Sequence, residues 1–230
     1  VQSIYRLKLP QGVKSLTDLK YLTNLEYLDA QQLGIKDITD IGKLKNLRVL
    51  YLQRNSISDI SALKNLTKLE VLSLNGNQVA SISALSSLTN LKELYLRENK
   101  IKDIAPLAKL TKLEVLEIGM NKINKIDAIK KLKKLRQLSL DNNQITDIKV
   151  LKDLSGLEKL YLQRNSIVSI NSLSGLKGLK YLSLNGNKIT DLKGLGNLKE
   201  LYLGENRISD YSPLKKMYLK PDFRCDFKIA

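Results

Sequence analysis

Carboxylates are the side chains of this sequence best suited to acid–base or metal chemistry, because the chain has no histidine and histidine is the commonest general base. Short polar residues recur at one position of a regular repeat: Asp37, Asp59, Ser81, Asp103, Asp147, Ser169, Asp191 and Asp210. Such a row could suggest a metal or acid site. One residue per repeat instead favours a structural role, in which each side-chain oxygen caps the helical turn that follows it.

Nucleophilic catalysis and cofactor binding have no matching motif in the chain. It contains no nucleophile elbow and no phosphate-cradling glycine loop. The single cysteine, Cys225, excludes an intrachain disulfide, a zinc finger and a CxxC redox site. We interpret Cys225 as a small core residue, with a reactive thiol as the alternative. The sequence therefore predicts a protein that is not an enzyme and has no catalytic residue, metal site or cofactor.

Asparagines form a second regular row, spaced 22 residues apart with one final interval of 19. The row consists of Asn55, Asn77, Asn99, Asn121, Asn143, Asn165, Asn187 and Asn206. An amide placed where the chain leaves a strand can satisfy backbone groups of the adjoining turns, and each buried backbone group left unmet costs about 1–3 kcal/mol. We therefore interpret the row as a structural asparagine ladder, with ligand contact as the alternative.

The elements that position these rows follow from the spacing of aliphatic residues, which residues 44–57 illustrate as LKNLRVLYLQRNSI. Leu50 and Leu52 alternate with period two, which predicts a short strand with two inward leucines. Other leucines and isoleucines fall every three residues, a spacing that suits 3₁₀ turns or extended coil. Stacked repeats share one continuous core. The prediction is an α/β solenoid, mostly β with 3₁₀ turns, curved as a right-handed horseshoe with a parallel sheet on its concave face.

The repeats divide the chain into three parts. We expect a partial N-terminal repeat, a solenoid of about nine repeats and a C-terminal strand or cap, at residues 1–19, 20–214 and 215–230. In the last part Phe223, Cys225, Phe227 and Ile229 alternate with charged residues, which is typical of a half-buried strand. A solenoid needs an end piece over its last repeat, and we expect that role here. The start of a further domain is the alternative.

The repeat unit LxxLxxLxLxxNxIxDIxxL, with aspartate before isoleucine as in ISDI at 57–60 and ITDI at 145–148, resembles bacterial internalin-type leucine-rich repeats over residues 13–214. IAPL at 104–107 and YSPL at 211–214 favour this type over the eukaryotic phosphatase-regulating repeats of equal length. The resemblance implies a leucine-rich repeat horseshoe in a surface or secreted protein that binds a host receptor with its concave face. Both ends depart from the family, because neither its helical N-terminal cap nor its immunoglobulin-like region is recognisable.

Outward positions of the strands form the candidate partner-binding surface. Tyrosine and arginine gather there, and both types are enriched at binding hot spots because they combine large area with a polar tip. The candidate contact residues are Tyr27, Arg48, Tyr51, Arg54, Tyr95, Arg97, Arg136, Tyr161, Arg164, Tyr181 and Tyr202. Tyrosine is also a good strand former, so a purely structural role is the alternative. The alternation of tyrosine with serine along one column favours binding.

The net charge of +16 raises nucleic acid, an anionic membrane surface or an acidic protein as partner. Outward strand positions carry slightly more acidic than basic residues, so the positive charge belongs to the convex side, the edges and the termini. Its densest part is Lys125, Lys130, Lys131, Lys133 and Lys134. This patch could bind a polyanion or be an ordinary solvated face. Because no aromatic residue is interleaved with the lysines, base stacking is not expected, and neither is a nucleic-acid partner.

These observations predict a protein-binding module, a bacterial surface or secreted adhesin that acts as a monomer. The alternatives are an intracellular scaffold or regulatory domain, and polyanion binding through the convex lysines. We expect an extracellular or bacterial-surface location, with the cytoplasm left open. No stretch approaches the ~18 apolar residues that would span a bilayer. Because the chain enters its repeat pattern in the middle at Val1, we expect a processed or trimmed product, whose missing signal peptide is uninformative.

Overall fold

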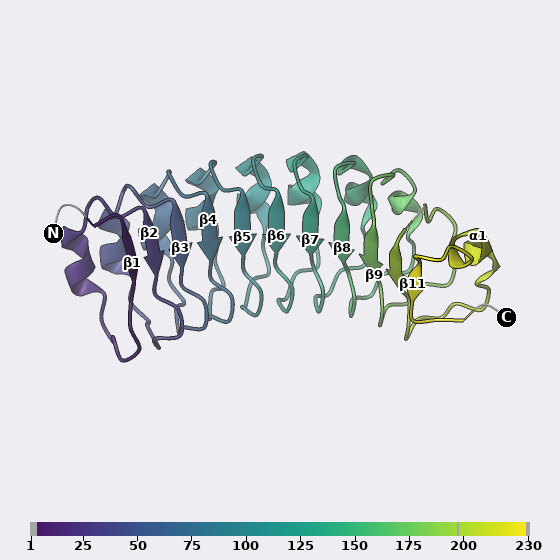
Figure 1. Cartoon of the computed structure of the whole chain (residues 1–230), viewed down its shortest axis with the longest axis horizontal. Helices are drawn as coiled ribbons and strands as arrows, with labels where there is room; N and C mark the ends of the chain where they lie inside the picture. The colour runs from purple at the N-terminus through teal and green to yellow at the C-terminus, as the bar shows by residue number, and fades with distance from the viewer. Residues whose placement is uncertain (1–3, 197, 229–230) are drawn as a thin grey trace.

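Parallel strands stack in sequence order into one sheet that follows the inner curve of the molecule (Figure 1). The structure is a computed structural model that describes residues 4–196 and 198–228. The strands of this described part are β1 (Arg6–Lys8), β2 (Tyr27–Asp29), β3 (Val49–Tyr51), β4 (Val71–Ser73), β5 (Glu93–Tyr95), β6 (Val115–Glu117), β7 (Gln137–Ser139), β8 (Lys159–Tyr161), β9 (Tyr181–Ser183), β10 (Glu200–Tyr202) and β11 (Arg224–Cys225). The curved solenoid with a parallel sheet, predicted from the repeat, is confirmed.

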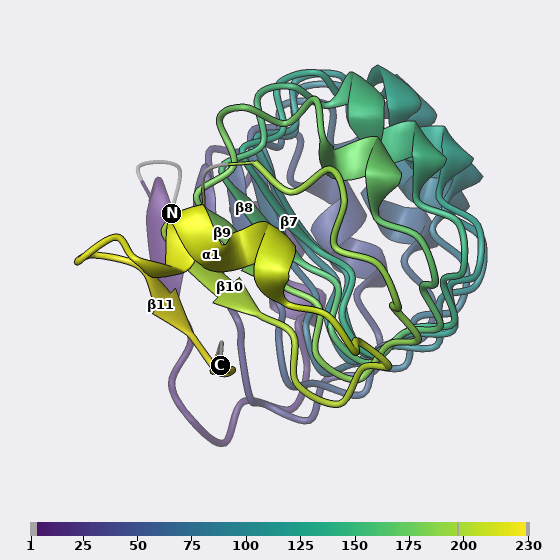
Figure 2. The ribbon, with the colours of Figure 1, turned by 90° about the vertical axis from the view of Figure 1, so that its right-hand side faces the viewer.

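Short 3₁₀ helices line the opposite, convex side of the stack, as the end-on view of Figure 2 shows. They are η1 (Thr17–Tyr21), η2 (Thr39–Lys43), η3 (Ser61–Asn65), η4 (Ser83–Ser87), η5 (Ala105–Lys109), η6 (Asp127–Lys131), η7 (Lys149–Asp153), η8 (Asn171–Leu173) and η9 (Ser212–Leu214), and one α-helix turn follows, α1 (Lys215–Tyr218). The period-three spacing of aliphatic residues therefore specifies 3₁₀ turns. No helix in the described residues is long and apolar enough to cross a membrane.

The core lies between the sheet and the convex turns and repeats the same positions in each rung. In the third rung Leu50 and Leu52 point inward from β3, while Ile57, Ile60 and Leu63 close the turn, and all five are buried. Register holds the leucines in line, since Leu50 pairs with the equivalent leucines of the strands on both sides. Continuous leucine columns result, so each rung is buried by its neighbours rather than by itself.

Each asparagine of the ladder joins its own rung to the preceding one. The Asn77 Nδ2 group donates to the carbonyls of Leu52 and Leu74, both at 3.0 Å, and its Oδ1 accepts the amide of Ile57 at 3.0 Å. The same three bonds recur at Asn55, Asn99, Asn121, Asn143, Asn165, Asn187 and Asn206. In the second rung Leu33 occupies the position of the ladder asparagine. There Asn55 Oδ1 also accepts the backbone amide of Leu33, at 3.0 Å.

The aspartate row caps the convex turns. Asp59 Oδ1 accepts the amide of Ser61, the first residue of η3, at 2.8 Å, and this bond lowers the pKa of Asp59. Equivalent bonds start η2, η5, η7 and η9, from Asp37, Asp103, Asp147 and Asp210. The capping role predicted for the row is confirmed for these five aspartates. The Ser81 hydroxyl instead donates to the Ser83 hydroxyl at 3.3 Å, and the predicted capping by Ser169 stays a prediction. Among the described residues, no group of three acidic or cysteine side chains could hold a metal ion.

The C-terminal segment covers the last rung. Phe223, Cys225 and Phe227 are half-buried, as the alternation predicts, and the Phe227 ring lies 5.0 Å from that of Tyr211. Ile229, which the same prediction included, lies outside the described residues. The strand is shorter than the alternation suggests: only Arg224 and Cys225 pair with β10. Beyond them the side chain of Asp226 replaces the backbone ladder, because its Oδ1 accepts the amide of Leu203 at 2.8 Å.

Candidate binding surface

One column of side chains runs the length of the inner sheet, formed by the last residue of each strand from β2 to β10. Its members are Asp29, Tyr51, Ser73, Tyr95, Glu117, Ser139, Tyr161, Ser183 and Tyr202. Ser73, Ser139 and Ser183 are at most 8% exposed, whereas the tyrosines are only half-buried. The serines therefore form the floor of the surface, and the tyrosine rings stand above it.

The tyrosines of the inner sheet fall into two groups. At the C-terminal end Tyr161, Tyr181 and Tyr202 form a continuous C-terminal tyrosine cluster, with ring centroids 4.6 Å and 5.6 Å apart. At the other end the Tyr27 and Tyr51 rings meet edge-on, with centroids at 5.8 Å. These spacings are those of favourable aromatic pairs. The N-terminal pair is partly covered, because the Arg6 guanidinium lies 4.2 Å above the centre of the Tyr27 ring.

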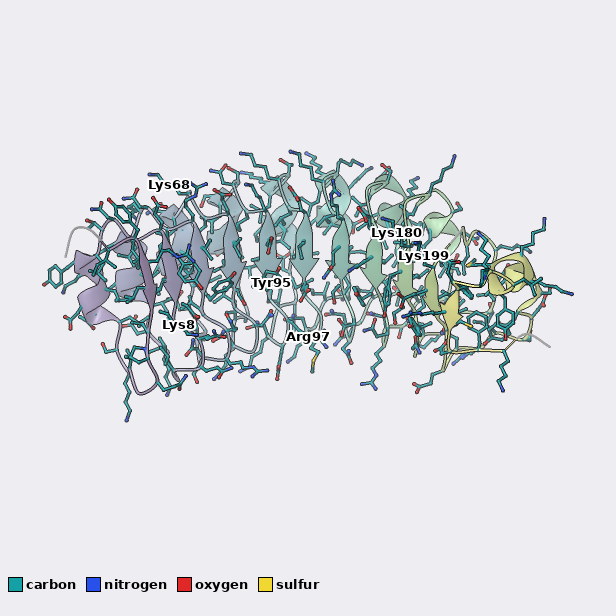
Figure 3. All side chains as sticks on the ribbon, in the orientation of Figure 1. Lys8, Lys68, Tyr95, Arg97, Lys180 and Lys199 are labelled. Carbon is teal, nitrogen blue, oxygen red and sulfur yellow. The ribbon has the colours of Figure 1, made fainter. Side chains whose placement is uncertain are left out.

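Tyr95, labelled in Figure 3, belongs to β5, between the two groups, and no ring of the described residues pairs with it. Its hydroxyl donates to Glu93 Oε2 at 2.7 Å, and the Tyr202 hydroxyl donates to Glu200 in the same way at 3.1 Å. Burial and the carboxylates of Glu93 and Glu117 raise the pKa of Tyr95 well above its ordinary value. Burial likewise raises the pKa of Tyr181 to about 12. The hydroxyls therefore stay protonated at neutral pH and can act as hydrogen-bond donors.

Charges of alternating sign run along one edge of the sheet, in the position just before each strand. The column is Glu26, Arg48, Glu70, Lys92, Glu114, Arg136, Glu158, Lys180 and Lys199. Glu70 accepts bonds from both Arg48 and Lys92, the second at 2.6 Å, and these bonds lower the pKa of Glu70. Glu158 accepts from Lys180 at 2.8 Å and from Arg136 at 3.2 Å. Arg48 and Arg136, two predicted partner contacts, are thus held in ion-paired triplets.

Arg97, another predicted contact, forms a salt bridge across the face. Its NH1 group lies 2.6 Å from Oδ1 of Asp141, whose side chain is only 1% exposed. Ser139 and Asn142 also donate to this carboxylate. Burial alone would raise the pKa of Asp141, but the bonds from Arg97, Ser139 and Asn142 together lower it. Sequence reasoning missed Asp141. The sequence nevertheless holds a signal for this salt bridge. Arg97, Gly119 and Asp141 occupy the same position of three successive repeats, and Gly119 has no side chain to separate the other two.

The remaining predicted contacts lie in two other places. Arg54 and Arg164 are exposed at the opposite edge of the sheet, where both have left-handed backbone with φ of 56°. Arg54 lines a shallow depression of about 480 Å³ together with Gln53, Gly76 and Arg97. The basic patch is separate from all of these residues, on η6 and the turns directly before and after it. Its members, Lys125, Lys130, Lys131, Lys133 and Lys134, are all exposed.

The leucine-rich repeat family, described as two tandem copies, matches most of the chain. The matched segments are residues 23–65, 45–87, 67–109, 89–131, 111–153 and 155–197. The comparison with curated proteins gives no match.

Solved structures with the same fold include bacterial and plant proteins. An internalin F from Listeria monocytogenes is 34% identical over the whole chain, with a TM-score of 0.83, and the chain spans 62% of its length. An internalin C2 from the same organism is 37% identical over 80% of each chain, with a TM-score of 0.74. The ectodomain of the plant receptor kinase GASSHO1/SCHENGEN3 from Arabidopsis thaliana, in complex with CASPARIAN STRIP INTEGRITY FACTOR 2, is 22% identical, with a TM-score of 0.80 over 99% of this chain and 33% of its own.

Proposed function

This chain belongs to the internalin-type leucine-rich repeat proteins, and from that premise we propose that its inner sheet binds a partner protein. One observation carries the proposal: half-buried tyrosine rings stand above a floor of buried serines along the concave face. Rigid aromatic side chains supply contact area at low entropic cost and are enriched at binding hot spots. This arrangement supports a binding role for the inner sheet.

The proposal extends to where the protein acts. The internalin likeness supports a secreted or surface-attached bacterial adhesin that recognises a host receptor as a monomer. The alternative is a scaffold or regulatory domain inside the cell. The chain spans only 62% of the internalin F chain, so the activity of the whole protein is part of this proposal. A secretion signal and a surface anchor encoded beside these repeats would support the adhesin, and a fused enzyme domain would support the scaffold.

Affinity capture from host and bacterial lysates tests the binding face. The bait is the chain itself, compared with a Tyr95→Ala/Tyr161→Ala double variant. We expect the variant to retain its fold and to bind the captured partner at least about tenfold more weakly, as loss of hot-spot residues does. A Lys130→Ala/Lys131→Ala variant is the control, because it changes only the convex side. Unchanged binding by the folded tyrosine variant would reject the inner sheet as the binding face.

A second candidate function is polyanion binding by the convex lysines. No salt bridge in the described ranges uses the ammonium groups of the five patch lysines, and Lys133 donates only to the carbonyl of Asp153 at 2.8 Å. Free positive charge of this kind attracts polyanions with an affinity that falls steeply as salt rises. Heparin retention that is independent of salt, or that Lys130→Ala/Lys131→Ala leaves unchanged, would exclude this function.

A further inference from the structure

The C-terminal tyrosine cluster differs from the rest of the inner sheet in its charges. Along the edge column Glu70 and Glu158 each pair with the basic residues on both sides, and the last of these pairs is Lys180 with Glu158 at 2.8 Å. The alternation then stops, because Lys199 follows Lys180 directly in the column. Lys199 and Lys180 lie in neighbouring strands, joined by a backbone bond of 2.8 Å, at the same edge of the sheet (Figure 3). Lys199 makes no salt bridge within the described residues.

Two more basic side chains border the cluster. Lys159 is the register partner of Tyr181 in the adjacent strand, and Arg224 is the register partner of Glu200 on the other side. Both are exposed. Lys159 precedes Tyr161 by two residues, as Glu93 precedes Tyr95. Within the part of the chain that the structure describes, no carboxylate therefore accepts a hydrogen bond from the Tyr161 hydroxyl. The cluster therefore combines an apolar surface with one uncommitted hydrogen-bond donor, the Tyr161 hydroxyl, and with positive charges.

The acidic side chains near the cluster already accept hydrogen bonds from other residues. Glu158 accepts bonds from Arg136 and Lys180. Glu200 accepts the Tyr202 hydroxyl at 3.1 Å. Asp226 accepts from Asn185 at 2.6 Å and from two backbone amides. Of these three described side chains, only Glu158 is paired with cations, and Glu200 and Asp226 keep their negative charge. The basic side chains around the cluster nevertheless outnumber these carboxylates, because Lys159, Lys199 and Arg224 make no ion pair within the described residues. The surroundings are therefore net positive, which is complementary to carboxylates.

We infer that the C-terminal tyrosine cluster binds an acidic linear segment of the partner protein, an inference that rests on the proposed binding role of the inner sheet. An aromatic or aliphatic side chain of the segment packs on the three rings. Neighbouring carboxylates pair with Lys159, Lys199 and Arg224 and accept the Tyr161 hydroxyl. The N-terminal pair is not equivalent, because Arg6 already lies on the Tyr27 ring.

Selection from a random displayed peptide library tests this inference, with the whole chain as bait. We expect the selected peptides to carry carboxylates next to an aromatic or aliphatic residue. A synthetic peptide of the selected sequence should bind at least about tenfold more weakly when its acidic residues are replaced by their amides, because charge-assisted hydrogen bonds are lost.

Two double variants with the same change in net charge distinguish binding at this site from nonspecific attraction of an acidic peptide to a basic protein. Lys199→Glu/Arg224→Glu should weaken the selected peptide at least about tenfold, whereas Lys130→Glu/Lys131→Glu, with the same change in net charge, should not. Tyr181→Ala should weaken it to a similar extent, and Tyr51→Ala should not. Because Lys199 and Arg224 are exposed, their reversal tests the site even where Tyr181→Ala disturbs packing.

Several outcomes would overturn the inference: no bound peptide, selected peptides without carboxylates, or equal losses in the two charge-reversed variants. Loss of peptide binding in Tyr51→Ala or Tyr95→Ala, with none in Tyr181→Ala or Lys199→Glu/Arg224→Glu, would overturn it while leaving the inner sheet as the binding face. Loss confined to the convex variant would reject both this inference and the proposed function.

Discussion

Arg97 reaches Asp141 over Gly119, two rungs along the sheet, and the two side chains form a salt bridge of 2.6 Å. Gly119 makes this possible, because a Cβ atom there would lie 2.2 Å from Asp141 Oδ1 and 2.6 Å from the Arg97 guanidinium. The same device recurs at the C-terminal end, where Asn185 donates to Asp226 at 2.6 Å beside Gly204. Each glycine in this column is thus bridged by the polar side chains on either side of it.

Replacement of Gly119 by alanine should break the salt bridge and destabilise the chain. Separating a buried ion pair leaves an unpaired charge. Because the Arg97 side chain is 39% exposed, solvent moderates the loss, and we expect about 2 kcal/mol. Urea unfolding measures it. Gly175→Ala is the control, since nothing lies within 4 Å of its added Cβ. Equal stability of the two variants would contradict the bridging role of Gly119.

The pH dependence of stability should reveal the same pair. The folded-state pKa of Asp141 lies below the ordinary value of 3.8, so its ionised form stabilises the fold. This contribution is fully present above that ordinary value and is lost as the pH falls through the lower, folded-state pKa. Asp141→Asn should therefore be less stable than the wild type at neutral pH, with the gap narrowing as the pH falls below 3.8. A gap that is constant with pH would contradict this assignment.

A single asparagine of the ladder should contribute measurably to stability. Asn121→Ala removes bonds to Leu96 and Ile118 carbonyls and to the Ile101 amide, at 3.0, 3.1 and 2.9 Å. Unmet buried backbone groups cost about 1–3 kcal/mol each, and partial access of water reduces the sum, so we expect a loss of about 3 kcal/mol. The exposed Asn124 lies outside the ladder, and Asn124→Ala should change thermal stability little. Similar losses in both variants would argue against the ladder.

Met120 occupies a backbone conformation that suits glycine. Its φ is 51°, and the equivalent positions two rungs before and three rungs after are Gly76 and Gly186, with φ of 65° and 66°. A side chain there costs about 1 kcal/mol. Met120→Gly should therefore stabilise the chain by about 0.5 kcal/mol after the entropic penalty of glycine. Val168 is also exposed but has no positive φ, so Val168→Gly should destabilise it. Melting temperatures that shift in the same direction would contradict this explanation.

The sequence predicts those parts of the molecule that depend on one repeat and its immediate neighbour. The inward leucines, the 3₁₀ turns and the aspartate caps follow from spacing alone, because identical repeats stack in register. The tyrosine column also follows, since the same register places Tyr51 and Tyr95 in one line with Ser73 between them.

Contacts that span two rungs were not predictable from residue type. Arg97 was chosen as a partner contact because arginine is common at interfaces, but its guanidinium binds Asp141, which lies 44 residues away. Arg48 is paired as well, but with Glu70 in the neighbouring rung. Alignment of the repeats in register would have shown Gly119 between Arg97 and Asp141. The identity of such pairs nevertheless depends on side-chain reach and burial, which spacing does not give.

We expect Asp226 to fix the C-terminal segment against the last rung of the sheet. Its two carboxylate oxygens accept the amides of Leu203 at 2.8 Å and Gly204 at 3.0 Å, where a longer β11 would have used its backbone. Asp226→Ala leaves these donors open to water, so the last rung should open locally while the central rungs stay intact. Hydrogen exchange of the Leu203 and Gly204 amides should accelerate at least about tenfold, with no change at Leu138. Asp222→Ala is the control, because Asp222 is exposed in the turn before β11. Unchanged exchange at Leu203 would show that the segment is held by its aromatic packing instead.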